Sequence, residues 1–275
     1  MTAVIAINCL SEIVALADTR VSSPGSVTSH RDILRKLYVF GTEGKSVVFG
    51  FSGNLEAARA VFLHICEGKL PRYRRRFVIP EFKDSLGSWI QEATSRRLSP
   101  GQREGLAFIL AGIEPSRHPR ISRNGHLVGF LNLPEVHIYQ YRVRRLDGTV
   151  TATRKPWFAI IGSGNLLQKQ VSSKLKEAIG FGFAQPNLHW GRAVLMAEIM
   201  SCLYATDASL GVGGPIQAIR IAPSGVDEQF AWPPGVPDRN MQVRREHGRI
   251  FLSKPGSDEE LALHPIWDLP GLGAA

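Results

Sequence analysis

The chain has 275 residues, of which 44% are hydrophobic, and its formal net charge is +9 at pH 7. That length suits one large domain or two small ones, and that apolar fraction is ordinary for a globular protein with a buried core. No stretch approaches the roughly 20 uninterrupted apolar residues of a membrane-spanning helix, and no Lys or Arg precedes the N-terminal apolar run, so we expect no membrane anchor and no secretory signal. Three scattered cysteines, Cys9, Cys66 and Cys202, argue against a disulfide framework or a clustered metal site and favour a reducing cytoplasm.

The positive net charge makes nucleic acid a candidate partner. The densest basic run is Arg72-Tyr73-Arg74-Arg75-Arg76, between two segments that we expect to be helical. Most charge runs are solvated, so we interpret this one as a solvated connection or a contact between subunits. No zinc-finger spacing, RNP motif or homeodomain-like helix accompanies it, and we therefore do not expect nucleic acid to be the partner.

The first fifty residues favour strands. Two short apolar segments, residues 3–8 and 12–19, are close enough to form a hairpin. A second such pair covers residues 37–40 and 46–51. Their content of Val, Ile, Phe and Tyr favours sheet over helix.

The spacing of the apolar residues then changes to that of a helix. One helical face carries Leu55, Ala58, Phe62 and Ile65. Asn54 is placed as the N-cap and Gly68 as the stop signal. A second helix is expected over residues 82–93, with its end near residues 98–101.

Strands resume after the second helix. We expect them at residues 106–113, 136–143 and 157–161, and the polar segment 114–134 is predicted to be a loop excursion. Two more amphipathic helices are expected at residues 167–179 and 188–206. A last strand at residues 216–221 follows a glycine-rich turn.

This order of elements indicates the fold class. Runs of strands and runs of helices that are segregated along the chain favour an α+β fold over alternating βαβ units. Two antiparallel sheets with helices on their outer faces would bury every apolar stripe. We therefore predict one domain over residues 1–222. Residues 223–275 are rich in Pro and Gly, and we expect a C-terminal extension with at most a short hairpin near residues 241–251.

Several familiar motifs are incomplete in this chain. GFSGN, residues 50–54, lies at a strand-to-helix turn, but Asn54 replaces the last Gly of the lipase motif G-x-S-x-G. GSG, residues 162–164, has Leu167 where the third Gly of a dinucleotide-binding loop belongs. No Walker sequence is present and the histidines never pair at ligand spacing. We expect no metal and no organic cofactor.

One set of residues is suited to nucleophilic catalysis. Removal of Met1 would expose Thr2, whose hydroxyl and α-amine then belong to one residue. A free α-amine has a pKa of about 8, so it can act as a base for its own hydroxyl. Asp18 ends the hairpin partner of the first strand, and Lys36 starts the third strand beside it. Asp18 would hold Lys36, which would lower the pKa of the Thr2 hydroxyl without holding the core. At Gly53 a strand turns into a helix, where a backbone N–H can meet an oxyanion.

The sequence resembles the proteasome β subunits and their bacterial relatives HslV and Anbu over residues 2–221. The matching segments, in the family's order, are TAVIAI (2–7), ADTR (17–20), RKLYVF (35–40), GFSGNL (50–55), IIGSG (160–164) and DASLGVGGPI (207–216). The resemblance implies that Thr2 is nucleophile and base, that Asp18 and Lys36 activate it, and that Gly53 donates to the oxyanion. It also implies a pocket shaped by Phe51. The shell that orients the Thr2 amine would contain Ser163, Asp207 and Ser209.

The resemblance further implies a four-layer αββα sandwich, the N-terminal-nucleophile (Ntn) hydrolase fold. It implies a threonine peptidase that cleaves peptides or unfolded proteins through an acyl-enzyme. The family's subunits assemble into rings or helical stacks, so we expect a homo-oligomer in the cytoplasm, with an ATP-dependent unfoldase as a candidate partner.

Two alternatives remain open at this stage. The fold could serve a small-molecule amidase, a transpeptidase or an inactive scaffold. It could also serve a basic nucleic-acid-binding protein, whose binding would weaken steeply with salt.

Overall fold

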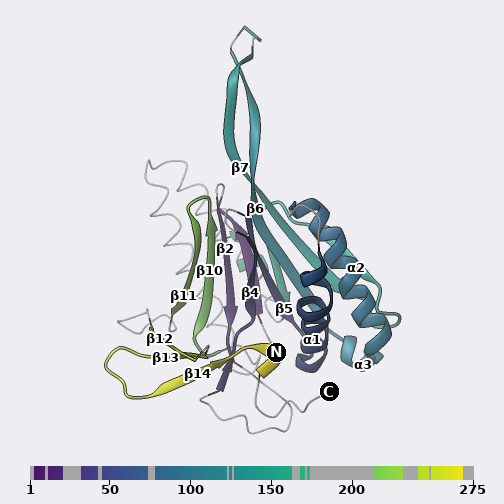
Figure 1. Ribbon diagram of the computed structural model, residues 1–275, viewed down its shortest axis with the longest axis vertical. Helices are drawn as coiled ribbons and strands as arrows, with labels where there is room; N and C mark the ends of the chain where they lie inside the picture. Colours follow the sequence, from purple (N-terminus) through teal and green to yellow (C-terminus); the bar gives the residue numbers. More distant parts are fainter. Residues whose placement is uncertain are drawn as a thin grey trace.

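The computed structural model describes residues 3–9, 12–20, 32–42, 45–73, 78–122, 124–125, 127–162, 168–170, 172–173, 213–231, 241–247 and 249–268. These residues form an α+β fold with two five-stranded sheets and one four-stranded sheet (Figure 1). No helix in these ranges is long and apolar enough to cross a membrane.

The first sheet contains the N-terminal strands and has the order β11-β10-β2-β1-β9. Its strands are β1 (Ala3–Asn8), β2 (Ile13–Asp18), β9 (Phe158–Gly162), β10 (Ile216–Ala222) and β11 (Gly225–Ala231). All neighbours are antiparallel, and the pairing of Val4 with Ala17 confirms the predicted first hairpin. β1 and β2 are continuous apolar runs because both of their faces are buried.

The second sheet has the order β4-β5-β6-β7-β8. Its strands are β4 (Leu37–Thr42), β5 (Lys45–Ser52), β6 (Ala107–Ile121), β7 (Leu127–Val143) and β8 (Val150–Arg154). The antiparallel pair of β4 and β5 confirms the second predicted hairpin. The sequence analysis missed β8, whose residues are mostly exposed and carry no apolar pattern.

The loop predicted for residues 114–134 is wrong. β6 and β7 stay paired from Ala107 opposite Arg142 to Ile121 opposite Leu127, and the outer part forms a two-stranded ribbon that extends beyond the body of the molecule (Figure 1). Proline argues against a strand because it lacks an N–H. In this ribbon Pro115 lies opposite Pro134. Hydrogen-bonded and non-hydrogen-bonded pairs alternate along an antiparallel ladder, and two prolines fit a non-hydrogen-bonded pair. We call residues 115–134 the arm.

Helices follow β5 as predicted, with one difference at the end of the first. α1 spans Leu55–Leu63 and is capped by Asn54. The Asn54 side chain accepts a hydrogen bond from the Ala57 N–H at 3.0 Å, which confirms the predicted N-cap. Gly68 does not stop the helix, because the chain continues through a π-helical turn, η1 (His64–Lys69), and a 3₁₀ turn, η2 (Leu70–Arg72). α2 (Ile79–Arg97) and the short α3 (Pro100–Arg103) complete this part of the chain.

α1 and α2 cover one face of the second sheet (Figure 1). Aromatic side chains make much of this contact: the ring centroid of Phe49 lies 5.0 Å from that of Phe62 and 5.4 Å from that of Phe108. Phe82 of α2 is also fully buried there. Each such side chain contributes about 1.5–3 kcal/mol by leaving water.

The two large sheets pack face to face. One buried cluster takes Val4 and Ala15 from the first sheet and Val48 and Ile109 from the second. The described residues therefore form three layers: helix, sheet and sheet. The outer helical layer expected over the first sheet falls on residues 167–179 and 188–206, which lie almost wholly outside the described residues.

The C-terminal part of the chain has more strands than the single predicted hairpin. Apart from β11, it contributes β12 (Gln242–Glu246), β13 (Arg249–Ser253), β14 (Glu260–His264) and the 3₁₀ turn η5 (Ile266–Asp268). β14 pairs in parallel with β3 (Asp32–Leu34), the short strand just before Lys36. A parallel pair between strands so far apart in sequence leaves no local signal.

Candidate active site

Asp18 and Lys36 form a buried ion pair between the two large sheets. Asp18 is the last residue of β2 and Lys36 precedes β4. The Lys36 Nζ lies 2.9 Å from the Asp18 Oδ2, and the two side chains are 2% and 0% exposed. The sequence predicts that these residues lie side by side, and the structure brings them into contact.

Asp18 also holds the start of β1. Its Oδ1 accepts a hydrogen bond of 2.8 Å from the backbone N–H of Ala3, and its Oδ2 accepts a weaker one, at 3.4 Å, from Gly213. Ala3 is bonded to Thr2, which itself lies outside the described residues. The buried carboxylate is therefore anchored one peptide unit from the candidate nucleophile.

The burial of this pair changes both of its pKa values. Loss of water raises the pKa of the Asp18 carboxyl, although the Lys36 charge and the Ala3 N–H act in the opposite direction. Loss of water also lowers the pKa of Lys36, although the Asp18 charge opposes this. The Lys36 ammonium therefore gives up a proton more readily than a lysine in water.

The Lys36 ammonium has three N–H donors. One is directed to Asp18 and a second to the backbone carbonyl of Arg20, at 2.7 Å. Among the described residues the third donor has no acceptor within hydrogen-bond distance. A hydroxyl oxygen could accept this third hydrogen bond.

Gly53 lies at the same end of the second sheet as Lys36. β5 runs antiparallel to β4 with Gly50 opposite Leu37, so its last residues pass the level of Lys36. Gly50 itself allows close approach of the sheets, because a Cβ there would lie 3.0 Å from a Val4 methyl. Gly53 has φ of +108°, and a Cβ there would lie 2.7 Å from the Gly105 carbonyl oxygen. Only glycine fits this turn without strain. Gly53 directly precedes Asn54, the N-cap of α1.

Phe51 lies in a different environment from the one expected of a pocket residue. Side chains alternate along a strand, so Phe49 and Phe51 point to the helices while Gly50 points to the first sheet. Phe51 is 1% exposed and its ring packs edge-on against Phe62 at 5.3 Å. The structure places it in the helix-side core and does not bring it to Lys36.

Four of the predicted site residues lie outside the described residues: Thr2, Ser163, Asp207 and Ser209. Two of their neighbours are described. Gly162, which precedes Ser163, pairs with Ala3 across β9 and β1. Gly213 donates its N–H to Asp18. No group of described His, Cys, Asp or Glu side chains could hold a metal ion.

Two polar residues next to Lys36 were not predicted from the sequence. Gln217 is fully buried in β10, and Glu228 is in β11. The sequence holds a signal for Gln217, because the remaining buried residues of the strand IQAIRIA are all Ile or Ala. A buried amide has to satisfy its hydrogen bonds, so a Gln in such a strand indicates a specific partner.

Comparison with families defined by sequence and with curated proteins found no match. Solved structures do match. Anbu (ancestral β-subunit) from Yersinia bercovieri superposes with a TM-score of 0.56 and 15% identity, covering 86% of this chain and 89% of that one. The Gly-1 mutant of Anbu from Hyphomicrobium sp. strain MC1 gives 0.57 and 20% over the same shares of both chains, and another structure of that Anbu gives 0.53 and 18%. The resemblance predicted from the sequence segments is thus confirmed at the level of architecture: this chain shares the proteasome-like fold of Anbu.

Proposed function

We propose that this chain is a threonine-type amide hydrolase that cleaves peptide bonds through an acyl-enzyme on Thr2. The observation that carries the proposal is the buried pair of Asp18 and Lys36, whose carboxylate also binds the N–H of Ala3. A pair of charges buried between two sheets is costly to build and does not favour folding by itself. Its position one peptide from an N-terminal threonine supports a role in activating that residue.

In the proposed reaction, the Thr2 Oγ1 attacks the carbonyl carbon of the scissile amide. The hydroxyl proton passes to the Thr2 α-amine, which is the general base. In this proposal the Lys36 ammonium would stabilise negative charge on the hydroxyl oxygen, while Asp18 holds the ammonium in place. The oxyanion of the tetrahedral intermediate accepts a hydrogen bond from the Gly53 N–H.

The intermediate then breaks its C–N bond. The protonated α-amine gives its proton to the departing amine, which leaves an ester between the substrate's acyl group and Thr2. A water molecule, deprotonated by the same α-amine, attacks the ester carbonyl carbon. The bond from that carbon to the Thr2 Oγ1 then breaks, the α-amine returns its proton to Oγ1, and the acid product leaves. Ser163, Asp207 and Ser209 would hold the amine in the orientation that both steps need.

The test depends on the α-amine. Chain that begins at Thr2, after removal of Met1, should be acylated once per subunit by a peptide β-lactone, with the added mass located on Thr2 by mass spectrometry. Chain that retains Met1 should not react and should have an unchanged circular dichroism spectrum. Thr2→Ala should also be unreactive, whereas Thr2→Ser keeps both groups and should retain part of the rate. Equal labelling of the Met1-retaining chain would exclude this mechanism.

A further inference from the structure

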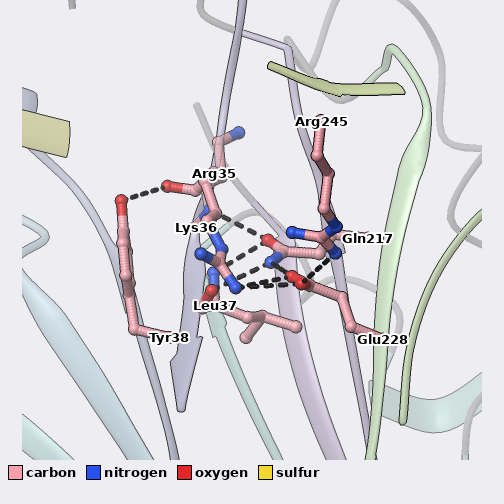
Figure 2. Close-up of polar contacts among 7 residues, drawn as sticks. All are labelled: Arg35, Lys36, Leu37, Tyr38, Gln217, Glu228 and Arg245. Carbon is pink, nitrogen blue, oxygen red and sulfur yellow. Dashed lines mark hydrogen bonds and ion pairs between the residues drawn. The ribbon is translucent and has the colours of Figure 1, made fainter. Parts of the chain in front are cut away.

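Gln217 connects the first sheet to the backbone of Lys36. Its side-chain oxygen accepts hydrogen bonds from the N–H groups of Lys36, at 3.0 Å, and Leu37, at 2.9 Å. Its side-chain nitrogen donates to the Leu37 carbonyl at 2.9 Å and to the Glu228 Oε1 at 2.8 Å (Figure 2). One buried amide thus satisfies three backbone groups at the start of β4.

These backbone groups need a partner from outside their own sheet. Among the described strands, β4 is at the edge of the second sheet and pairs there with β5 alone. Lys36 lies between β3 and β4 and belongs to neither strand. Its N–H is buried and would be without a partner if Gln217 lost its side-chain oxygen, which is unfavourable.

Glu228 sets which way the Gln217 amide faces. Both oxygens of the Glu228 carboxylate accept hydrogen bonds from the Arg35 guanidinium, at 2.8 and 3.0 Å. The Arg245 guanidinium lies 3.5 Å from the Glu228 Oε2 (Figure 2). It is an acceptor only, so it selects the nitrogen of the amide. A flipped amide would place its oxygen against Glu228 and its nitrogen against two N–H donors.

We propose that Gln217, held by Glu228, is a positioning residue for Lys36. The two hydrogen bonds from the backbone at Lys36 and Leu37 restrain the Lys36 Cα. From that Cα the side chain reaches both Asp18 and the Arg20 carbonyl. The effect on catalysis rests on the proposed function, whereas the restraint of the backbone does not.

Hydrogen exchange tests the restraint without any substrate. In Gln217→Leu, the amides of Lys36 and Leu37 should exchange about tenfold faster or more, while those of β1 keep their protection. The matched control is Gln140→Leu, because Gln140 is also buried and donates to the Ile160 carbonyl on another part of the sheets. That control should leave Lys36 and Leu37 protected. Unchanged protection of both amides in Gln217→Leu would overturn the proposal.

A second pair of variants covers the case in which Gln217→Leu fails to fold. Gln217→Glu places a carboxylate beside Glu228 and should expose the same two amides to exchange. Adding Glu228→Gln supplies a donor to the new carboxylate and should restore part of the protection. A double variant that exchanges as fast as Gln217→Glu would contradict the role given to Glu228.

Acylation by the peptide β-lactone tests the consequence for the site. In Gln217→Leu the maximal rate of acylation should fall about tenfold or more while the half-saturating concentration stays unchanged, because Lys36 acts on the reacting hydroxyl. Absence of acylation in the wild-type chain would refute the proposed function and leave the exchange result to decide the restraint. A wild-type rate in a variant whose two amides exchange fast would refute the positioning role.

Discussion

Asp18 and Lys36 form a buried ion pair whose carboxylate also accepts a hydrogen bond from the Ala3 N–H. The sequence predicts that the Lys36 charge acts on Thr2 without holding the core. The structure shows both side chains out of contact with water. Removal of one partner would strand the other as a buried charge, so this pair also affects folding.

A double-mutant cycle measures that coupling. Asp18→Asn and Lys36→Met should each lower the free energy of unfolding by about 3–5 kcal/mol, and the double variant should lose less than the sum of the two. Urea titration gives the three values. Arg154→Met is the control, because its ion pair with Glu135 is exposed and should contribute about 1 kcal/mol or less. Additive losses would show that the pair is not coupled.

The Cys66 thiol offers a pH-dependent test of the helix-side core. Burial raises the pKa of Cys66 to about 11. At pH 8 only about 0.1% of it should be thiolate, and its alkylation by iodoacetamide should rise about tenfold per pH unit up to pH 10. Since the unfolded chain loses this proton first, the thiol's contribution to stability should be lost as pH rises from about 9 to about 11. Peptide mass spectrometry follows the alkylation, and a plateau of the rate by pH 9 would contradict the burial.

At the scale of elements, the apolar periodicities predicted most of the described strands and the helices α1 and α2. β1, β2, β4 and β5 are short apolar runs joined by local turns, so each is decided by neighbouring residues. β3 and β8 were missed because one has three residues and the other an exposed surface. The arm was missed because its prolines and polar residues are typical of a loop.

The arm should be dispensable for folding. Pro115 and Pro134 have no N–H, so they form a non-hydrogen-bonded pair of the ladder. Because the two kinds of pair alternate, the adjacent pair of Glu114 and Glu135 is hydrogen-bonded. A hydrogen-bonded pair can close a two-residue turn. Replacing residues 115–134 with Asn-Gly should therefore keep the sheet, including the hydrogen bond from the Ile79 N–H to Glu114. We expect a melting temperature within about 5 °C of the intact chain. Loss of cooperative unfolding would show that the arm is part of the core.

For the whole molecule, assembly remains a prediction from the resemblance to ring-forming subunits. The monomer has a mass of 30.3 kDa, and light scattering at micromolar concentration should give a particle several times heavier. We suggest for this contact three apolar residues of the helix expected over residues 188–206, which lie outside the described residues: Trp190, Met196 and Met200. A stable monomer would argue against a ring or stack. If the intact chain assembles, the arm-deleted chain shows whether the arm makes the contact.

The amino-acid sequence was enough to predict the first two hairpins, the α+β class and the candidates Thr2, Asp18 and Lys36. These predictions were possible because apolar period, capping residues and the register of a hairpin depend on residues close together in the chain. The burial of the ion pair, the placement of Phe51 in the core and the bond from Lys36 to Gln217 depend on tertiary packing. The last joins residues 181 positions apart. No local pattern encodes such a contact, because it exists only when the two sheets pack face to face and exclude water.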